Sequence, residues 1–501
     1  MGLQLHNTLS GKTEEFQPLE DNEVRIYTCG PTVYDYAHIG NFRTFVFQDV
    51  LRRYLEYAGY RVKQVMNLTD VDDRTIRNSQ DAGVSLRDYT QKFIDSFMQD
   101  RELLGLEPPE IVVRATDCID DMIRLVQTLE AKGFAYRTDG STYFRLSAFK
   151  NYGQLSKRNF SANRPGARVD ADEYDKDDVR DFALWKAAKP GEPSWDAPFG
   201  AGRPGWHLEC SAMAMKFLGE TFDIHSGGAD LIFPHHENEI AQSEAATGKP
   251  FARFWLHAEH LIVNGEKMSK SLGNFYTLRD LISQGHRPSA IRYLLASVPY
   301  TRPLNFTFDG LLQAQKSIER LRNFEYRARN EDFPPGEGPV LATRAQNARE
   351  AFERALDNNL NTAEALGAVF EMVSEGNTAM DRGEFREADR GAVLDTLRRW
   401  DRVFCVLEDN DYAKLLGQGL IVARDAAREE VPDGELAAEQ GRDGNAPLVV
   451  WPDEEIERKL ALRGAARAQG NYAESDRIRD ELLKAGVILE DTKAGTRWKR
   501  K

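Results

Sequence analysis

The amino-terminal part of the chain shows two different periods of apolar residues. Residues 24–28 (VRIYT) form a short apolar run that predicts a strand. Residues 38–59 then place apolar side chains three and four positions apart, which predicts a helix that ends at Gly59. Residues 61–68 (RVKQVMNL) predict a second strand. A strand, a helix and a strand in this order predict the opening of a parallel α/β sheet.

The remaining sequence changes character several times. An amphipathic helix is expected over 118–132, followed by irregular, highly charged chain to about residue 200. A strand should end in the Gly-Gly turn of FDIHSGGADL, and Asn264-Gly265 predicts a hairpin turn. Long helices are expected over 311–408, then an acidic linker over 409–450 and a small terminal unit.

Composition narrows the class of protein. A chain of 501 residues is expected to form two to four domains. No apolar run approaches the roughly 20 residues of a membrane span, and MGLQLHNTLSGKTEEF lacks the pattern of a secretory signal. We therefore expect a cytoplasmic protein with no membrane partner. The net charge of −14 argues against indiscriminate DNA binding, but the terminal stretch TKAGTRWKRK is locally basic.

Four cysteines are too few for a disulfide scaffold, and two of them accompany other metal-ligand residues. His235 and Glu239 are four residues apart on a helix that should begin at Pro234, so both side chains can meet one ion. Cys210 lies upstream, and Cys29 follows the first strand, at the sheet edge where ligands gather. Two thiolates, an imidazole and a carboxylate would suit zinc.

This spacing leaves other interpretations open. Cys29 and Cys210 could equally be small buried residues, and His236 and Glu237 offer neighbouring donors. Cys118 and Cys405 are expected to be core cysteines.

Two further segments have the composition of nucleotide-binding motifs. Residues 38–41 (HIGN) open the first helix, where His38 can donate to a phosphate and Gly40 permits close approach. Residues 267–274 (KMSKSLGN) place Lys267 and Lys270 on a loop that can close over a triphosphate. Each segment alone is most often an ordinary helix start or exposed turn, whereas both in this order favour nucleotide chemistry.

These segments together resemble the class I aminoacyl-tRNA synthetases, and among them the cysteine-specific family. The resemblance extends over nearly the whole chain and includes YTCGPTVYDYAHIGN, NLTDVDD, GWHLECSAM, DIHSGGADLIFPHHENEIAQSEA, EKMSKSLGN and AESDRIRDELLKAGVILEDTKAGTRWKR. It selects Cys29, Cys210, His235 and Glu239 as zinc ligands and Lys270 as the ATP-binding lysine. One departure is Asn41, which stands where the family usually has a histidine; asparagine can donate to a phosphate but carries no charge.

The resemblance implies a mixed α/β fold with a Rossmann-like parallel-sheet catalytic domain. The expected divisions are the catalytic domain's first half (1–114), a connective-peptide insertion (115–200), the catalytic second half with the zinc ligands (201–260), the KMSKS loop and stem-contact region (261–310), a tRNA-binding helical bundle (311–408), a linker (409–450) and an anticodon-binding unit (451–501).

The implied activity joins L-cysteine to tRNA(Cys), using ATP with Mg²⁺ and one zinc ion, in a chain expected to be a monomer. His38 and Asn41 would contact the phosphates, and Lys267 and Lys270 would stabilise the departing pyrophosphate. Gly228 and Asp230 would meet the adenosine. Trp206 and His225 would either line the cysteine pocket or have structural roles. Because a thiolate binds zinc far better than a serine hydroxyl does, no separate editing domain is expected.

Two other functions compete with this interpretation. A related ligase would transfer activated cysteine to an amino-sugar and would need no tRNA-binding tail. A catalytically inactive relative would bind tRNA as a regulator, which Asn41 alone favours.

Overall fold

The computed structural model describes residues 2–158, 180–336, 338–423, 448–492 and 495–500. These residues form two compact units. One unit contains residues 1–281 and 286–408, and the other contains residues 282–285 and 409–501.

A parallel five-stranded sheet forms the centre of the larger unit, with strand order β11-β10-β3-β4-β5. The strands are β3 (Glu23–Thr28), β4 (Arg61–Leu68), β5 (Ile111–Arg114), β10 (Phe222–Gly228) and β11 (Ala252–Ala258). Helix α1 (Ile39–Tyr57) connects β3 to β4. Successive strands extend from β3 in one direction through β4 and β5, whereas β10 and β11 lie on its other side. The strand order therefore reverses at β3, and in open parallel sheets such a reversal predicts a ligand-binding crevice at the carboxyl ends of the two strands, here β3 and β10.

Helices pack around this sheet and share its core. They include α2 (Asp73–Asp81), α3 (Leu86–Leu103), α4 (Ile119–Ala131), α5 (Trp206–Leu218) and α6 (Glu237–Thr247). One apolar cluster joins Tyr27 and Val65 of the sheet with Met122 of α4, Met213 of α5 and Ile240 of α6. Cys118 is buried in the same cluster, as predicted.

The insertion between β5 and α5 contains more regular structure than its sequence predicted. Four short strands form an antiparallel sheet in the order β6-β7-β8-β9. They are β6 (Ala135–Thr138), β7 (Ser141–Phe144), β8 (Phe182–Ala187) and β9 (Gly202–Pro204). Every residue of β7 and β9 is buried, so these strands lack the alternation of apolar and polar residues that reveals a half-buried strand. The charged stretch DADEYDKDDVRD lies almost wholly outside the described residues.

Further short elements precede the first strand of the central sheet in the sequence or follow its last strand. They are β1 (Gln4–Asn7), β2 (Lys12–Glu15), β12 (Leu261–Val263), β13 (Glu266–Lys267), β14 (Leu304–Phe306), α7 (Leu278–Ser283) and α8 (Pro288–Ala296). The predicted hairpin turn is present between β12 and β13, where Asn264 and Gly265 have φ values of 51° and 83°. The glycines of FDIHSGGADL belong to the end of β10 rather than to a turn after it, because both lie in its pairing register with β11.

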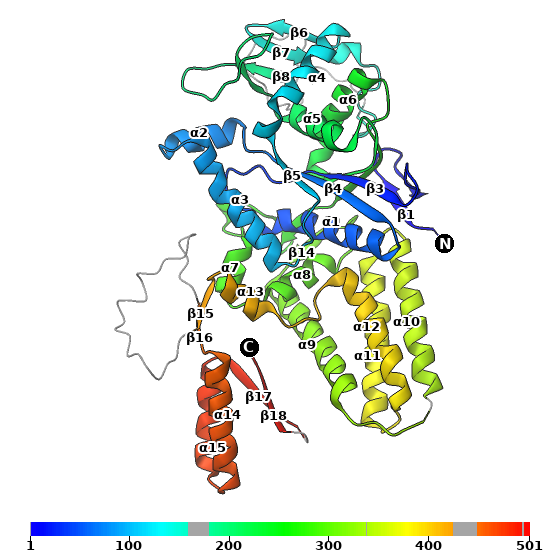
Figure 1. Cartoon of the computed structure of the whole chain (residues 1–501), viewed down its shortest axis with the longest axis vertical. Helices are drawn as coiled ribbons and strands as arrows, with labels where there is room; N and C mark the ends of the chain where they lie inside the picture. The colour runs from blue at the N-terminus through cyan, green and yellow to red at the C-terminus, as the bar shows by residue number, and fades with distance from the viewer. Residues whose placement is uncertain (1, 159–179, 337, 424–447, 493–494, 501) are drawn as a thin grey trace. The chain divides into compact units, whose positions relative to one another are not determined.

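Four helices follow in the same unit and pack along one another (Figure 1). They are α9 (Phe308–Asn330), α10 (Pro339–Asp357), α11 (Thr362–Asp381) and α12 (Glu387–Phe404). Their apolar faces bury Phe324, Ala345, Val369 and Trp400 completely. Cys405 is only half-buried, contrary to prediction, because it caps α12 in a left-handed conformation with φ of 54°.

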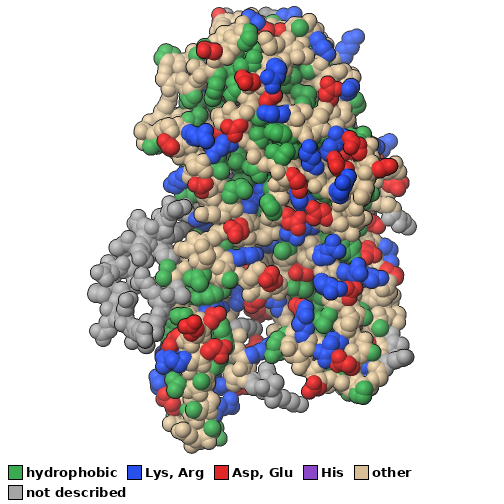
Figure 2. Space-filling model, in the orientation of Figure 1, with side chains coloured by type: hydrophobic (Ala, Val, Ile, Leu, Met, Phe, Trp, Pro, Cys, Tyr) green, Lys and Arg blue, Asp and Glu red, His purple; other side chains and the backbone are tan. Residues whose placement is uncertain are grey.

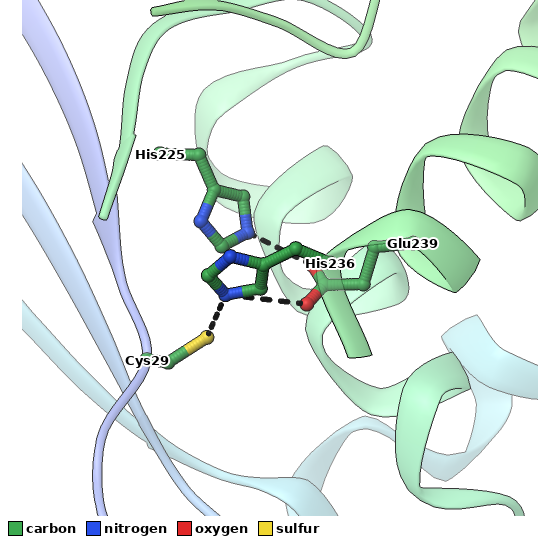
Figure 3. Close-up of side chains that lie close together, drawn as sticks. All are labelled: Cys29, His225, His236 and Glu239. Carbon is green, nitrogen blue, oxygen red and sulfur yellow. Dashed lines mark hydrogen bonds and ion pairs between the residues drawn. The ribbon is translucent and has the colours of Figure 1, made fainter. Parts of the chain in front are cut away.

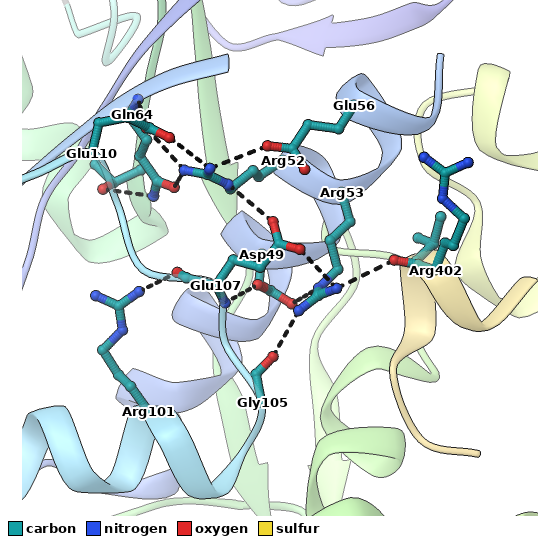
Figure 4. Close-up of polar contacts among 12 residues, drawn as sticks. Asp49, Arg52, Arg53, Glu56, Gln64, Arg101, Gly105, Glu107, Glu110 and Arg402 are labelled. Carbon is teal, nitrogen blue, oxygen red and sulfur yellow. Dashed lines mark hydrogen bonds and ion pairs between the residues drawn. The ribbon is translucent and has the colours of Figure 1, made fainter. Parts of the chain in front are cut away.

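Polar contacts tie α1 to the end of this bundle (Figure 4). Arg53 donates to Asp49 one turn earlier, to the carbonyl of Gly105 and to the carbonyl of Arg402 in α12. Tyr54 of α1 also donates its hydroxyl to Asp357 at the end of α10. The helix that begins beside the crevice is therefore fixed at its other end to the bundle.

The elements of the smaller unit are α13 (Asp411–Gly417), β15 (Ile421–Ala423), β16 (Leu448–Val450), α14 (Asp453–Ala468), α15 (Tyr472–Lys484), β17 (Val487–Thr492) and β18 (Gly495–Arg500). In this unit, helices α14 and α15 and the hairpin β17-β18 surround a small core of Ile456, Ile478, Leu482 and Val487. The segment predicted as a linker thus includes α13 and the paired strands β15 and β16, and its residues 424–447 lie outside the described part.

Basic and acidic side chains are interspersed over the visible face (Figure 2). Among the described residues, the helices are all too short or too polar to cross a membrane. The predicted α/β class, with a parallel catalytic-type sheet, an insertion, a helical bundle and a small terminal unit, is confirmed.

Candidate metal centre and nucleotide site

The four predicted metal ligands meet at the carboxyl edge of the central sheet. Cys29 directly follows β3, and Cys210 lies in α5. His235 lies in the turn just before α6, and Glu239 lies in the first turn of α6. One ligand atom from each residue falls within 4.8 Å of the other three, and all four side chains are buried. The two sulfur atoms are 4.0 Å apart, and both cysteines are free.

The helix that carries His235 and Glu239 begins differently from the prediction. Phe233 has an extended backbone, residues 232–236 form a single wide turn, and regular α-helix begins only at Glu237. Wide turns of this kind are frequent at functional sites. The expected meeting of the two side chains still occurs, because His235 Nε2 lies 3.0 Å from Glu239 Oε1.

A second set of donors overlaps the first (Figure 3). It consists of Cys29, His225, His236 and Glu239, whose ligand atoms also lie within 4.8 Å of one another. His236 Nε2 is 3.3 Å from Cys29 Sγ, and His225 Nε2 is 2.9 Å from Glu239 Oε2. His236, which sequence spacing left as an alternative donor, thus contacts the predicted ligand Cys29, and His225 contacts Glu239.

Two histidines that the sequence reasoning missed extend the cluster. His207 Nδ1 lies 2.9 Å from His235 Nδ1, and His257 Nε2 lies 2.7 Å from His236 Nδ1. His257 occupies the carboxyl end of β11, the same sheet edge that identified Cys29, so that position was a usable signal. Trp206 is 38% exposed and stacks its ring on His235 at 4.1 Å.

The charges of this cluster fit a metal ion. Burial raises the pKa of Cys29 and Glu239 well above their usual values and also raises that of Cys210. Burial lowers the pKa of His235 well below its usual value, so the ring is a neutral donor. Glu239 Oε1 is buried and, although His235 Nε2 lies 3.0 Å away, the two atoms do not have hydrogen-bond geometry, whereas buried oxygens normally have a partner. A cation bound among these atoms would complete the contacts of Oε1 and stabilise the ionised thiols and carboxyl.

The first nucleotide motif forms a capping box at the start of α1. His38 Nδ1 accepts a hydrogen bond from the Asn41 amide at 3.2 Å, and Asn41 Oδ1 accepts one from the His38 amide at 3.1 Å. Asn41 therefore uses its oxygen to begin the helix, which leaves its side-chain NH₂ as the group that can donate. Burial lowers the pKa of His38.

The second motif lies against the first. Ile39 donates its amide to the carbonyl of Tyr276, and the ring of Phe275 meets His38 edge-on at 5.0 Å. A Cβ atom on Gly40 would lie 3.0 Å from Met268 Cε, so glycine here allows the loop to approach α1 closely. Lys267 and Lys270 are both exposed on this loop.

The candidate adenosine contacts lie at the strand-order reversal. Gly228 ends β10, and a Cβ atom there would lie 2.4 Å from Asp230 Oδ1 and 3.6 Å from Thr44 Oγ1 of α1. Asp230 is exposed. The metal cluster and the two nucleotide motifs therefore border the same crevice between β3 and β10.

Comparisons with known proteins agree with this arrangement. Residues 15–316 match the family described as tRNA synthetases class I (C) catalytic domain, and residues 351–408 match the DALR domain. The cysteine–tRNA ligases of Koribacter versatilis and Solibacter usitatus are 54% and 52% identical to this chain, and each match covers 100% of both sequences.

Solved structures show the same fold at low sequence identity. Mycobacterium tuberculosis methionyl-tRNA synthetase bound to methionyl-adenylate has a TM-score of 0.58 at 15% identity, covering 79% of this chain and 94% of that one. The leucyl-tRNA synthetase of Agrobacterium radiobacter K84 has a TM-score of 0.57 at 11% identity, covering 80% and 86%. These two likenesses concern the fold, whereas the full-length relatives identify the family. This chain belongs to the cysteine–tRNA ligase family of class I aminoacyl-tRNA synthetases.

Proposed function

We propose that this chain activates L-cysteine with ATP and transfers the cysteinyl group to tRNA(Cys). The observation that carries the proposal is the convergence of Cys29, Cys210, His235 and Glu239 beside the two nucleotide motifs. A thiol-specific metal centre next to a phosphate-binding helix start accounts for both substrates of the first step.

We propose zinc as the metal, held by these four residues. Two sulfur, one nitrogen and one oxygen donor match its preference, and thiolates bound to tetrahedral zinc at about 2.3 Å lie about 3.8 Å apart. The two sulfurs are 4.0 Å apart here, close to that value. Zinc held by these residues would supply a soft Lewis acid for the thiolate of the cysteine substrate, and it would disfavour a serine hydroxyl, which ionises far less readily.

Trp206 and His225 support the metal ligands in different ways. The half-exposed ring of Trp206 stacks on His235, which supports its assignment as a wall of the cysteine pocket. His225 is fully buried and holds Glu239 Oε2, so it orients that carboxylate.

The activation step needs positioned charge rather than a protein nucleophile. The cysteine carboxylate attacks the α-phosphorus of ATP, the bond to pyrophosphate breaks, and cysteinyl-adenylate forms. His38 and the side-chain NH₂ of Asn41 donate to phosphate oxygens, while Lys267, Lys270 and Mg²⁺ neutralise the departing pyrophosphate. Gly228 and Asp230 contact the adenosine, and the amides at the start of α1 add donors for the phosphates.

The transfer step uses the helical and terminal parts of the chain. We assign tRNA binding to the bundle of residues 311–408 and anticodon recognition to residues 451–501, with the 2′-hydroxyl of the terminal ribose as the acceptor. The basic sequence of β18 (GTRWKR) supports this assignment. The described part of the insertion 115–200 consists of helix and a small sheet, and we assign it no editing reaction. We expect the chain to act as a cytoplasmic monomer.

One set of assays tests the proposal. Purified protein should catalyse ATP–pyrophosphate exchange that depends on cysteine and should aminoacylate tRNA(Cys) transcripts. Preferential transfer to an amino-sugar supplied as a competing acceptor would identify the amino-sugar ligase instead. Tight tRNA binding without exchange would identify an inactive relative.

A further inference from the structure

The proposed ATP-binding lysine is paired with a carboxylate that the mechanism above does not use. We propose that Asp35 is a positioning residue for Lys270: it holds the ammonium group beside the nucleotide site and releases it when a triphosphate binds. The inference rests on the role proposed for Lys270.

Contacts on both side chains define the pair. Asp35 lies in the segment between β3 and α1, and its Oδ2 forms an ion pair with Lys270 Nζ. Its Oδ1 accepts a hydrogen bond from the amide of Tyr36 at 2.8 Å, which fixes the orientation of the carboxylate. Lys270 Nζ also lies 5.1 Å from the centre of the Phe275 ring. The ammonium group is thus held between an acid three residues before the first motif and an aromatic ring directly after the second.

The backbone around Lys270 is already fixed by contacts that do not involve its side chain. Asn274 accepts a hydrogen bond from the Ser269 amide at 2.8 Å and donates to the carbonyl of Lys267 at 3.2 Å. The amide of Ile39 anchors the following chain through Tyr276. Lys270 can therefore exchange partners by moving its side chain, without refolding of the loop.

The pair lies within electrostatic reach of His38, the first residue of the other nucleotide motif. The Asp35 carboxylate raises the pKa of His38 and the Lys270 ammonium lowers it, although burial has the largest influence. Because His38 caps the helix proposed to bind phosphate, an arriving triphosphate enters the field of both Asp35 and Lys270. A phosphate group carries more charge than one carboxylate and competes for the ammonium.

Exposure limits how strongly Asp35 can retain the lysine. The side chains of Lys270 and Asp35 are 65% and 35% exposed, and exposed ion pairs are weak. Breaking such a pair changes affinity by a factor of about two to five. The same factor applies to the affinities for ATP and for pyrophosphate. Binding of either ligand breaks the ion pair between Lys270 and Asp35, and dissociation of that ligand restores the pair.

The test compares Asp35→Asn with the wild-type full chain by calorimetry, with Mg²⁺–ATP and with pyrophosphate and without cysteine. Asparagine keeps the acceptor for Tyr36 and removes the charge. Both ligands should bind about two to five times more tightly to the variant. The Michaelis constant for cysteine, measured separately in the exchange assay, should be unchanged. Unchanged or weaker binding of both ligands in a variant with the wild-type melting temperature would overturn the inference.

A charge-matched control and a double variant separate the ion pair from general electrostatics. Glu266→Gln removes one exposed negative charge from β13, four residues before Lys270. This variant should leave the affinities for ATP and for pyrophosphate unchanged. In a Lys270→Gln background, Asp35→Asn should have no effect on ATP affinity, since the pair is already absent. An equal gain in that background would refute the pairing mechanism. A different outcome would refute the proposed function alone. In it, the wild-type chain shows no cysteine-dependent exchange, whereas Asp35→Asn still binds ATP more tightly than the wild type does.

Discussion

Arg292 of α8 places Nη2 2.5 Å from Asp49 Oδ2 of α1, and both side chains are almost completely buried. Arg292 also donates to the carbonyl of Phe404 at the end of α12, and Asp49 accepts from Arg53 and from the amide of Glu107. The ion pair and its neighbouring contacts therefore join α1, which begins with the first nucleotide motif, to α8, the second helix after the lysine loop, and to the end of the helical bundle.

Loss of one partner of this pair should strongly destabilise the larger unit. Arg292→Met leaves Asp49 buried with a reduced set of partners, and such changes cost about 3–5 kcal/mol. Chemical denaturation should show this loss. Arg398→Met is the matched control, because Arg398 pairs with Asp395 on the exposed face of α12 and should change stability by no more than about 0.5 kcal/mol. Equal effects of the two substitutions would contradict the structural role of the pair.

The ion pair between Arg292 and Asp49 also predicts how the free energy of unfolding depends on pH. Burial alone would raise the pKa of Asp49, but Arg292 and Arg53 more than offset it and lower the pKa below its usual 3.8. A carboxyl with a lowered folded-state pKa contributes stability above its unfolded pKa, and that contribution is lost as pH falls through the folded value. The stability difference between wild type and Asp49→Asn should therefore be constant near pH 7 and shrink below about pH 4. A difference that grows in acid would contradict this assignment.

Removal of one thiol should abolish metal retention. Cys210→Ser replaces a thiolate with a harder and less acidic donor, so the protein should lose most of its bound zinc, about one ion per chain in the wild type. Elemental analysis measures the metal, and cysteine-dependent exchange should fall with it. Cys405→Ser is the control, since Cys405 lies at the end of α12, away from the cluster, and should retain full metal content. Full zinc in Cys210→Ser would remove Cys210 from the ligand set.

Truncation of Trp206 should affect cysteine more than ATP. The ring stacks on His235 at 4.1 Å, and aromatic contacts of this kind contribute about 0.5–1.5 kcal/mol. Trp206→Ala should raise the Michaelis constant for cysteine by about two- to tenfold in the exchange assay. The constant for ATP in the same assay serves as the internal control. A rise confined to ATP would place Trp206 outside the cysteine pocket.

Local sequence pattern determined those elements whose signal is contained within a few residues. The strand predicted over 61–68 has the same bounds in β4, because its partners on both sides bury it and short-range apolar pattern suffices. The Asn264-Gly265 hairpin followed from the positive φ angles that such turns need. The resemblance to a known family also anticipated the four candidate ligand residues that the fold brings together.

Tertiary structure decided what depends on partners distant in the chain. The contacts of His225 with Glu239 and of His236 with Cys29 require β10 to pair with β3, about 200 residues away in sequence, and the wide turn that precedes α6. The insertion sheet was missed because β7 is buried throughout and its register depends on β8, beyond the charged segment. Periodicity reports which face of an element is buried, whereas pairing and convergence follow from the packing of the whole chain.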